Sequence, residues 1–318
     1  MAYNNNSIII SVIIPTFNRS HILEKCLRSM EKQNIDKTLF EVIIADDGST
    51  DDTKKIVNSF ILRDRIKIIY LKQVNSGANR ARNYAISNAC GDLILFINDD
   101  IIPDKSMLSQ HILSHKEHPQ NHLGVLGRVT IDRDIPYSPF AKLHLDAVFS
   151  SLKDKEWLDW KYFFTCNVSV KKIFLSEHGN FDEKMRYHED IELGERLFCK
   201  GFKIKYNKEA AGFHYHFLKE EEFLKIAVRD GKALAVWYKK APYLKTVLAD
   251  IGFYPGEKFF YRIKYFAADF IINKRTIPYF LILGKKIIKK NEKTGLILYR
   301  KIFQALKRGA LANELSGT

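Results

Sequence analysis

The chain has 318 residues, of which 46% are hydrophobic and 13% aromatic. This apolar content suffices for one large α/β domain with an appendage or for two modest domains, and it excludes a largely disordered chain. The net charge of +14 is concentrated in residues 217–318, where Lys and Arg outnumber Asp and Glu by 21 to 9, so we expect a nearly balanced domain over 1–216 and a basic helical extension over 217–318.

Short apolar runs alternate with helical patterns through the first hundred residues. Strands are expected at 8–14, 40–45, 66–71 and 92–97, because these runs are rich in β-branched residues and nearly continuous, as in buried parallel strands. Helices are expected at 20–33, from a cap at Ser49 or Thr50 to about 62, and at 78–89. This order predicts right-handed crossovers and an α/β fold, with a mostly parallel, Rossmann-like central sheet flanked by helices.

The remainder of the chain is mixed and then helical. Strands are expected over 123–131, 163–170 and 202–206, a helix over 191–200, and a loop-rich insertion over 132–160. A helix over 219–240 and two or three more over 257–312 follow, broken near Pro278 and Asn291. We find no secretory signal, and every apolar run is far shorter than the roughly 20 residues of a membrane-spanning helix. The four cysteines are far apart, so we expect reduced thiols and a cytoplasmic protein.

Acidic side chains follow two of the predicted strands, at the carboxyl ends where such sheets bind ligands. Asp46 and Asp47 follow the second strand, and carboxylates there accept hydrogen bonds from a ribose hydroxyl or a base N–H. A helix-capping turn explains this pair equally well. Asn98, Asp99 and Asp100 follow the fourth strand. They offer the hard oxygen ligands that Mg²⁺ or Mn²⁺ takes beside substrate phosphates. A polar turn at the end of the strand explains them equally well.

Three further positions carry candidate chemistry. Arg82 lies in the first turns of the helix expected at 78–89 and suits a phosphate, although a solvated arginine is the plainer interpretation. Glu189 and Asp190 begin a helix, where the dipole already favours acids, and one of them suits a general base. His214 and His216 lie on one face of a strand-like segment, as metal ligands or as structural histidines.

Taken in order, these motifs resemble glycosyltransferase family 2. The similar segments are Ser11–Arg19, Val42–Asp51, Gly77–Asn83, Asn98–Asp100 and the stretch from Asn167 to Arg196. The resemblance covers residues 8–216 and implies a GT-A fold with inverting transfer from a nucleotide-sugar donor. It divides the domain into a nucleotide-sugar-binding half, about 8–103, and an acceptor half, about 104–216.

The resemblance also implies roles on the donor side. The nucleoside would be held by Pro15, Phe17, Asp46 and Asp47. The first acid of the family's D-x-D metal motif is Asn98 here, and an amide keeps an oxygen acceptor but loses the charge. Asp100 would therefore hold the metal, and Asp99 would turn toward the donor sugar or ribose.

The remaining roles concern the diphosphate, the metal shell and the acceptor. Arg82 would assist the diphosphate, and His214, preferred to His216, would complete the metal shell. Asp190 would take the proton from the acceptor hydroxyl while Glu189 orients the sugar or the acceptor.

The predicted function is an inverting, hexosyltransferase-type enzyme of polysaccharide or glycolipid assembly. It would use Mg²⁺ or Mn²⁺, a nucleotide-sugar donor with a UDP-sugar favoured, and a saccharide or lipid-linked acceptor. A nucleotidyltransferase-like enzyme is the first alternative, but residues 15–19 contain no glycine of a phosphate loop. A basic nucleic-acid-binding protein is the second, but no such motif appears and the charge lies in the tail.

The basic tail predicts a peripheral site of action on the inner face of the membrane. Four lysines stand among Leu and Ile residues, as in helices that lie on anionic lipid: Lys285, Lys286, Lys289 and Lys290. Packing of these helices on the catalytic domain, with a solvated lysine face, is an equal alternative.

Overall fold

The computed structural model describes residues 8–244 and 270–316 of the chain. Two compact units divide it: Met1–Ile135 with Val148–His216, and Pro136–Ala147 with Phe217–Thr318. The segment Pro136–Ala147, which lies within the expected loop-rich insertion, therefore belongs to the second unit.

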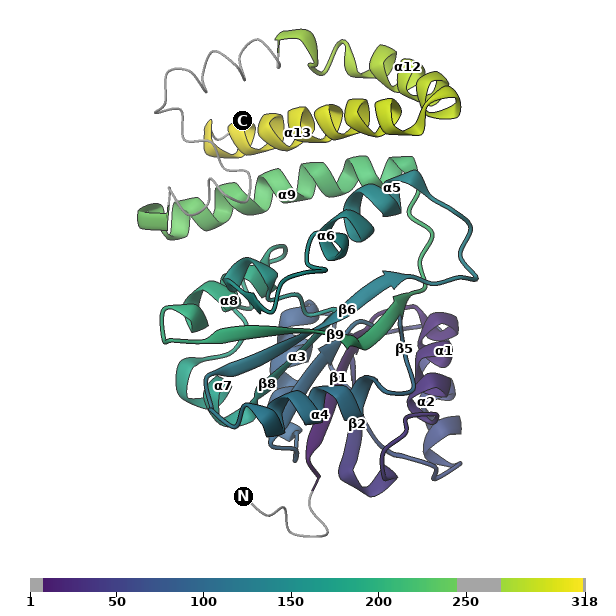
Figure 1. The fold of residues 1–318 in the computed structure, drawn as a ribbon, viewed down its shortest axis with the longest axis vertical. Helices are drawn as coiled ribbons and strands as arrows, with labels where there is room; N and C mark the ends of the chain where they lie inside the picture. The colour runs from purple at the N-terminus through teal and green to yellow at the C-terminus, as the bar shows by residue number, and fades with distance from the viewer. Residues whose placement is uncertain (1–7, 245–269, 317–318) are drawn as a thin grey trace. The chain divides into compact units, whose positions relative to one another are not determined.

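The first unit is built on a central sheet (Figure 1). Its nine described strands lie in the order β3-β2-β1-β4-β8-β6-β9-β5, and β7 pairs with β9. The strands are β1 (Ile10–Thr16), β2 (Phe40–Asp46), β3 (Lys67–Lys72), β4 (Leu93–Ile97), β5 (Ile101–Pro103), β6 (Leu123–Ile131), β7 (Trp157–Leu158), β8 (Asn167–Lys171) and β9 (Lys203–His214). The half from β3 to β4 is parallel, as predicted, whereas β8 is antiparallel to both of its neighbours. The sheet as a whole is thus mixed.

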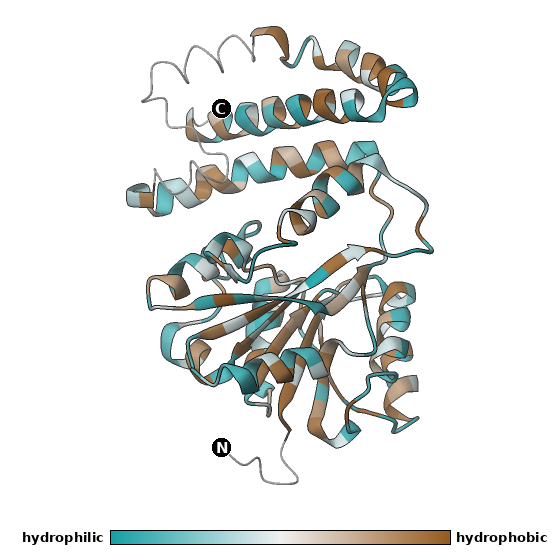
Figure 2. Cartoon of the chain, in the orientation of Figure 1, coloured by the Kyte–Doolittle hydropathy of each residue, from teal (hydrophilic) through white to brown (hydrophobic). Residues whose placement is uncertain are grey.

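Helices cover the sheet and bury its central strands. They are α1 (Ser20–Met30), α2 (Thr53–Ile61), α3 (Ala78–Asn88), α4 (Met107–Glu117), α7 (Lys172–His178) and α8 (Glu189–Phe198), with short helices η1 (Lys37–Leu39), α6 (Ala147–Ser150) and η3 (Trp160–Tyr162). Helix α3 packs on β1 and β2, and α4 packs on β6 and β9. Every residue of β2 and β4 is buried, and Figure 2 shows the central strands as largely hydrophobic. Strands buried on both faces explain the continuous apolar runs of the sequence.

The predicted strands and helices of the first hundred residues are confirmed within a few residues. Two later expectations were inaccurate. The strand expected from Phe163 begins only at Asn167, because the Phe163 side chain turns into the core against Phe202, with ring centroids 5.8 Å apart. The short strand expected at 202–206 extends to His214, because β9 continues past a register shift opposite Gly127 and Val129.

The second unit is helical. It contains α5 (Pro139–Ala141), η2 (Lys142–Asp146), α9 (Glu220–Lys240), η4 (Pro242–Leu244), α12 (Ile277–Lys290) and α13 (Glu292–Ser316). Helix α13 packs against both α9 and α12. Helix α9 approaches α13 at Gly231, where an added Cβ would lie 2.1 Å from the carbonyl oxygen of Lys307. No helix within the described residues is long and apolar enough to cross a membrane.

The helix over 219–240 and the break at Asn291 are confirmed. The break expected near Pro278 is confirmed, because residues 272–276 form bends and turns between the helical Phe270 and Ile271 and the start of α12 at Ile277. Pro278 occupies the first turn of α12, where its missing N–H would have had no partner in the helix. The part of the prediction that covers 257–269 lies outside the described residues. The loop-rich reading of 132–160 was incomplete, because short helices occupy much of 139–150.

Candidate active site

Three parallel strands of the first unit end at one edge of the sheet. Strand β1 pairs in parallel with both β2 and β4, so their carboxyl ends meet there. Thr16 ends β1 opposite Asp46, the last residue of β2. Across the same edge, Thr16 Oγ1 donates a hydrogen bond of 2.7 Å to Asp99 Oδ2, beyond the end of β4. The acids that follow β2 and β4 thus belong to one edge, beside the half-buried Pro15 and the exposed Phe17.

The end of β9 brings a histidine to this edge. Strand β5 pairs with β9 so that Ile101 lies opposite His214, and the Tyr215 N–H donates to the Asp100 carbonyl oxygen at 2.7 Å. His214 Nε2 lies 3.4 Å from Asp100 Oδ2. The His216 ring packs edge-on against the His214 ring, with centroids 5.7 Å apart. The structure therefore places His214 against the carboxylate that the sequence assigned to a metal.

Arg19 bridges the two neighbouring acids. Its Nη1 lies 2.9 Å from Asp99 Oδ1 and its Nη2 lies 2.8 Å from Asp100 Oδ2. Burial raises the pKa of Asp99 to about 6, against the opposing charge of Arg19. Burial alone would also raise the pKa of Asp100, but the hydrogen bonds and charges of His214 and Arg19 hold it well below its usual range. Asp100 therefore stays ionised.

Asp46 and Asp47 hold the neighbouring loops. Asp47 accepts hydrogen bonds from Gln73 Nε2 at 2.7 Å and from the Ser76 and Gly77 N–H groups at 2.8 Å each. Asp46 accepts a 2.7 Å bond from the Ser49 N–H and a bond from the Tyr70 hydroxyl. Both side chains are buried. The bonds of Asp47 order the loop that precedes α3, and those of Asp46 hold the turn after β2 and reach Tyr70 on β3. The predicted contact of both acids with a nucleoside stays a prediction.

Arg82 points from α3 toward the start of α8. Its Nη1 lies 3.3 Å from Glu189 Oε1 and donates to Asn79 Oδ1 at 3.2 Å, and its guanidinium stands over the Phe181 ring at 5.4 Å. Its Nε is buried without a hydrogen-bond partner in the described part of the chain. An arginine this buried, with one donor unused, is suited to an additional anion.

Asp190 lies in the first turn of α8. The Ile191 N–H donates to its Oδ1 at 2.8 Å, and the Thr165 N–H lies 3.4 Å from its Oδ2. Burial raises the pKa of Asp190 to about 6, and the charge of Glu189 adds to this effect. A carboxylate with such a pKa is ionised near neutral pH and still basic enough to accept a proton.

Cys166 shows that the two halves of the site converge. Burial raises the pKa of its thiol, and the charges of Asp190 and Asp100 both raise it further. The residues on either side of Cys166 show the geometry, because the Thr165 N–H lies 3.4 Å from Asp190 Oδ2 and Asn167 pairs with Ile97 at the end of β4. Asp100 follows β4, Asp190 begins α8, and Cys166 precedes β8, so three elements distant in the sequence meet here.

The donor atoms at Asp100 suit a divalent ion. Asp100 Oδ1 is buried and has no hydrogen-bond partner among residues 8–244 and 270–316. An unpaired buried carboxylate oxygen is costly, and a hard cation would satisfy it. In the same described ranges, no group of three or more His, Cys, Asp or Glu side chains is arranged to hold a metal ion. Asp100 with His214 fits the mode in which Mg²⁺ or Mn²⁺ takes one or two protein ligands and substrate phosphates.

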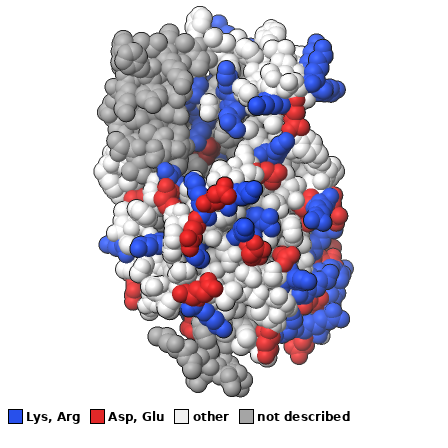
Figure 3. All heavy atoms as spheres, in the orientation of Figure 1, with Lys and Arg blue, Asp and Glu red and all other residues white. Residues whose placement is uncertain are grey.

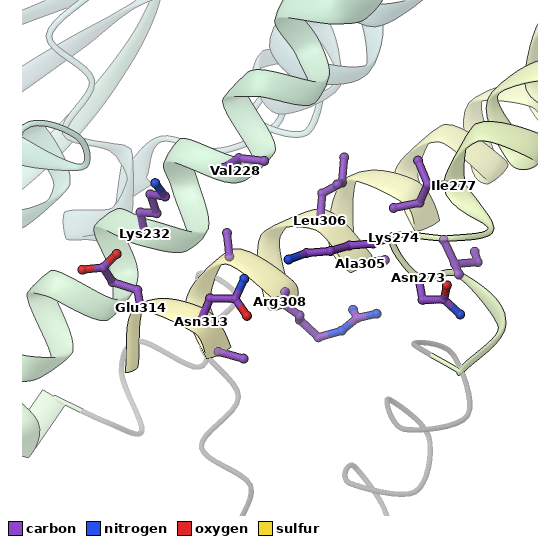
Figure 4. Close-up of a pocket in the computed structure, with 14 residues that line it drawn as sticks. Val228, Lys232, Asn273, Lys274, Ile277, Ala305, Leu306, Arg308, Asn313 and Glu314 are labelled. Carbon is purple, nitrogen blue, oxygen red and sulfur yellow. The ribbon is translucent and has the colours of Figure 1, made fainter. Parts of the chain in front are cut away.

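Two contacts of the site were missed by the sequence reasoning. Thr16 and Arg19 were noted only as members of a motif, yet both bind the acids that follow β4. The sequence places Thr16 at the end of a buried strand and Arg19 just beyond it, but it gives no signal for the distant acids that they bind. The helical unit has a separate cavity of about 450 Å³ between α9, α12 and α13, lined among others by Lys232, Lys274 and Arg308 (Figure 4).

Comparisons with known proteins find similar chains. The sequence model of Glycosyl transferase family 2 matches residues 11–170, half of the chain. The uncharacterized glycosyltransferase YfnE of Bacillus subtilis is 28% identical over 253 residues, covering 64% of this chain and 64% of YfnE. The poly(ribitol-phosphate) β-N-acetylglucosaminyltransferase TarS of Staphylococcus aureus is 33% identical over 130 residues, covering 41% of this chain and 23% of TarS. Less than two thirds of either relative is therefore matched.

Solved structures show the same fold. The mannosyltransferase PcManGT of Pyrobaculum calidifontis, in complex with GDP-Man and Mn²⁺, superimposes with a TM-score of 0.65 at 16% identity, over 99% of this chain and 89% of that one. Residues 1–349 of S. aureus TarS, in complex with UDP-GlcNAc, give a TM-score of 0.57 at 20% identity, over 98% and 93% of the two chains. The predicted GT-A fold with C-terminal helices is confirmed.

Proposed function

The chain belongs to glycosyltransferase family 2, and on that premise we propose that it transfers a sugar from a nucleotide-diphosphate donor to an acceptor hydroxyl with inversion at the anomeric carbon. The observation that carries the proposal is that the segment Thr165–Asn167 reaches both acids at the carboxyl edge of the sheet: the Thr165 N–H lies 3.4 Å from Asp190 Oδ2, and Asn167 pairs with Ile97, three residues before Asp100. Asp100 lies on the side of the departing diphosphate and Asp190 on the side of the incoming hydroxyl. A single displacement needs a charged group at each of these two positions.

Asp190 is the general base of this proposal. Its backbone hydrogen bonds fix the carboxylate, and its pKa of about 6 leaves it ionised at neutral pH. It takes the proton of the acceptor hydroxyl as the bond to the anomeric carbon forms. Glu189, paired with Arg82, orients the sugar or the acceptor. Arg82, which has an unused buried donor, assists the diphosphate.

The donor side uses the edge between β1, β2 and β4. Pro15, Phe17 and Asp47 lie at that edge and hold the nucleoside. We favour a UDP-sugar because TarS, one structural neighbour, is solved with UDP-GlcNAc. Asp100 and His214 would hold Mg²⁺ or Mn²⁺, and a bound ion would supply positive charge beside the leaving diphosphate. PcManGT, another neighbour, is solved with Mn²⁺. Residues 8–103 then form the donor half and residues 104–216 the acceptor half.

A screen of donors tests the proposal without a known acceptor. The melting temperature of the protein is measured with Mn²⁺ and UDP-, GDP- or dTDP-sugars, and release of the free nucleotide is followed with water as the acceptor. We expect one donor class, UDP-sugars first, to raise the melting temperature and to be hydrolysed slowly. If no nucleotide sugar binds or is hydrolysed, the proposed function is wrong. Binding of bare nucleoside triphosphates with diphosphate release would instead favour a nucleotidyltransferase.

The acceptor in this proposal is a saccharide or a lipid-linked saccharide of polysaccharide or glycolipid assembly. TarS is named for a poly(ribitol-phosphate) substrate, which supports a polymer or an anchored acceptor. The helical unit offers a surface for an anionic membrane. On α12, Tyr279, Ile282 and Leu283 are 73%, 57% and 45% exposed, and the exposed Lys286 and Lys290 continue the same helix face at i+4 spacing. Exposed Lys and Arg side chains stand beside uncharged ones in this unit (Figure 3).

Vesicle binding tests this surface on the full chain. Membrane attraction falls by about 1 kcal/mol per lysine removed from the surface, so Lys286→Glu with Lys290→Glu should reduce co-sedimentation with phosphatidylglycerol vesicles at least tenfold. The matched control is Lys54→Glu with Lys55→Glu, two exposed lysines of α2 in the other unit. Equal loss in both double variants would contradict a specific membrane face on α12.

A further inference from the structure

The guanidinium of Arg19 occupies the space between Asp99 and Asp100. Its two terminal nitrogens each bind a different carboxylate, at 2.9 Å and 2.8 Å. The two carboxylate side chains are only 4% and 8% exposed, whereas that of Arg19 is 34% exposed. Two adjacent buried carboxylates repel each other strongly unless a cation lies between them. Arg19 provides that cation within the chain itself.

The backbone and the side chain of Arg19 have separate functions. Its carbonyl oxygen accepts the Ile22 and Leu23 N–H groups at 3.0 Å each and so begins α1. Its half-exposed side chain approaches the acids from the solvent side on a flexible stem. The guanidinium can therefore leave the carboxylates by side-chain rotation, without any change in the strand or the helix.

The mobility of the Arg19 side chain bears on metal binding because one oxygen of Asp100 has no hydrogen-bond partner within the described residues. Arg19 and His214 both lie against Asp100 Oδ2, while the buried Oδ1 has no partner within the described residues. An ion that binds Oδ1 comes within a few ångströms of the guanidinium, because both oxygens belong to one carboxylate. Even in bulk water, a divalent ion about 5 Å from a unit positive charge is repelled enough to weaken binding by more than tenfold.

We propose that Arg19 is an internal counter-cation that neutralises Asp99 and Asp100 before the donor binds, and that the divalent ion displaces it. The inference rests on the proposed metal site at Asp100 and His214. The ion then binds only when the diphosphate supplies further oxygen ligands, because the protein alone gives it a site that is already neutralised. Ion and donor therefore enter together, and free Mn²⁺ binds the nucleotide-free protein weakly.

The test measures Mn²⁺ binding to nucleotide-free protein, from the electron paramagnetic resonance signal of the free ion. Arg19→Gln should tighten Mn²⁺ binding at least tenfold, and Arg19→Lys, which keeps the charge but loses the two-pronged contact, should tighten it less. Arg28→Gln is the matched control, because Arg28 lies on α1, which Arg19 begins, and is exposed, and its ion pair is with Glu24 and not with the acids after β4. The control should bind Mn²⁺ as the wild type does.

The variant loses a buried ion pair, so its folding needs its own measurement. Its melting temperature should be lowered and should rise more on addition of Mn²⁺ than that of the wild type. If Arg19→Gln does not fold, Arg19→Lys carries the test, and Mn²⁺ binding no tighter than that of the wild type overturns the inference.

UDP binding in the presence of Mn²⁺ separates this inference from the proposed function. Wild-type protein that binds UDP with Mn²⁺, together with Arg19→Gln that binds free Mn²⁺ no more tightly, overturns the role of Arg19 and leaves the transferase intact. Wild-type protein that binds neither UDP nor a UDP-sugar at any Mn²⁺ concentration overturns both.

Discussion

Replacement of Asp190 by Asn tests the centre of the proposed mechanism. The amide has nearly the same shape and keeps one oxygen, which can accept the Ile191 N–H that donates to Oδ1 at 2.8 Å, while the longer 3.4 Å contact of the Thr165 N–H with Oδ2 is lost. It cannot accept a proton, and a positioned general base contributes on the order of 10²–10⁴ in rate. We therefore expect nucleotide release from the UDP-sugar at saturation to fall by that factor, which corresponds to about 3–5 kcal/mol of transition-state stabilisation.

The same variant should bind UDP as tightly as the wild type, because Asp190 is assigned to the acceptor and not to the donor. Isothermal titration with UDP and Mn²⁺ measures this directly. Asp64→Asn is the matched control, since Asp64 is exposed and its positive φ of 49° is one that asparagine adopts readily. An Asp190→Asn variant that keeps more than about a fifth of the wild-type rate would refute the assignment. Loss of UDP binding would show instead that Asp190 shapes the donor site.

Three more predictions follow from the same structure. The transfer rate should fall about tenfold per pH unit as the pH drops below about 6, because Asp190 must be ionised and its pKa is raised to about 6; a rate profile from pH 4.5 to 8 shows this. Chelation with EDTA should lower nucleotide release by on the order of tenfold or more, and Mn²⁺ should restore it in the wild type but not in Asp100→Asn. Burial lowers the pKa of His111 to about 4, below that of the unfolded chain, so the stability it contributes is complete above pH 6.5 and is lost as the pH falls toward 4. Urea unfolding should show this loss across that window, and it should be smaller in His111→Gln.

The first four strands and the acids that follow them were predictable because the signals are local. Strands β1, β2 and β4 are continuous apolar runs buried on both faces, and polar residues begin where each run ends. Parallel pairing then brings Asp46 and Asp99 to one edge without further information. The identity of the sheet edge follows from the chain order of strands and helices.

The contacts that complete the site depend on long-range packing, which carries no short sequence signal. Arg19 shows no periodic pattern that would aim its side chain at acids some eighty positions away. Similarly, Phe140 joins the helical unit by packing its ring against Phe223 and Tyr299, with centroids 5.5 Å and 4.9 Å away. Neither segment looks different in sequence from an ordinary loop.

The approach of His214 to Asp100 depends on a buried polar residue in the middle of the sheet. Asn167 lies opposite Ile97 on β4, directly before the acids, and its amide nitrogen donates to the Ala210 carbonyl oxygen on β9 at 2.8 Å. Its side-chain oxygen contacts the buried His111 ring at 2.9 Å, so the amide is held from both sides. The close approach requires Gly127, because an added Cβ there would lie 2.2 Å from both the Asn167 amide nitrogen and the Ala210 carbonyl oxygen.

This contact lies where the pairing of β6 with β9 shifts its register, between Gly127 and Val129. The pairing moves from Gly127–Asn207 to Val129–Gly212, so β9 has three more residues than β6 in this interval, and a shift by an odd number of residues turns the later side chains to the opposite face. The shift therefore decides which residues at the end of β9 meet β5, and the observed pairing puts His214 opposite Ile101, next to Asp100. Asn167 thus has a structural reason to be buried and polar: it fixes the register that brings the histidine to the acid. The arrangement of acids and histidine at the carboxyl edge of the sheet is in this sense set by side chains in the interior of the sheet.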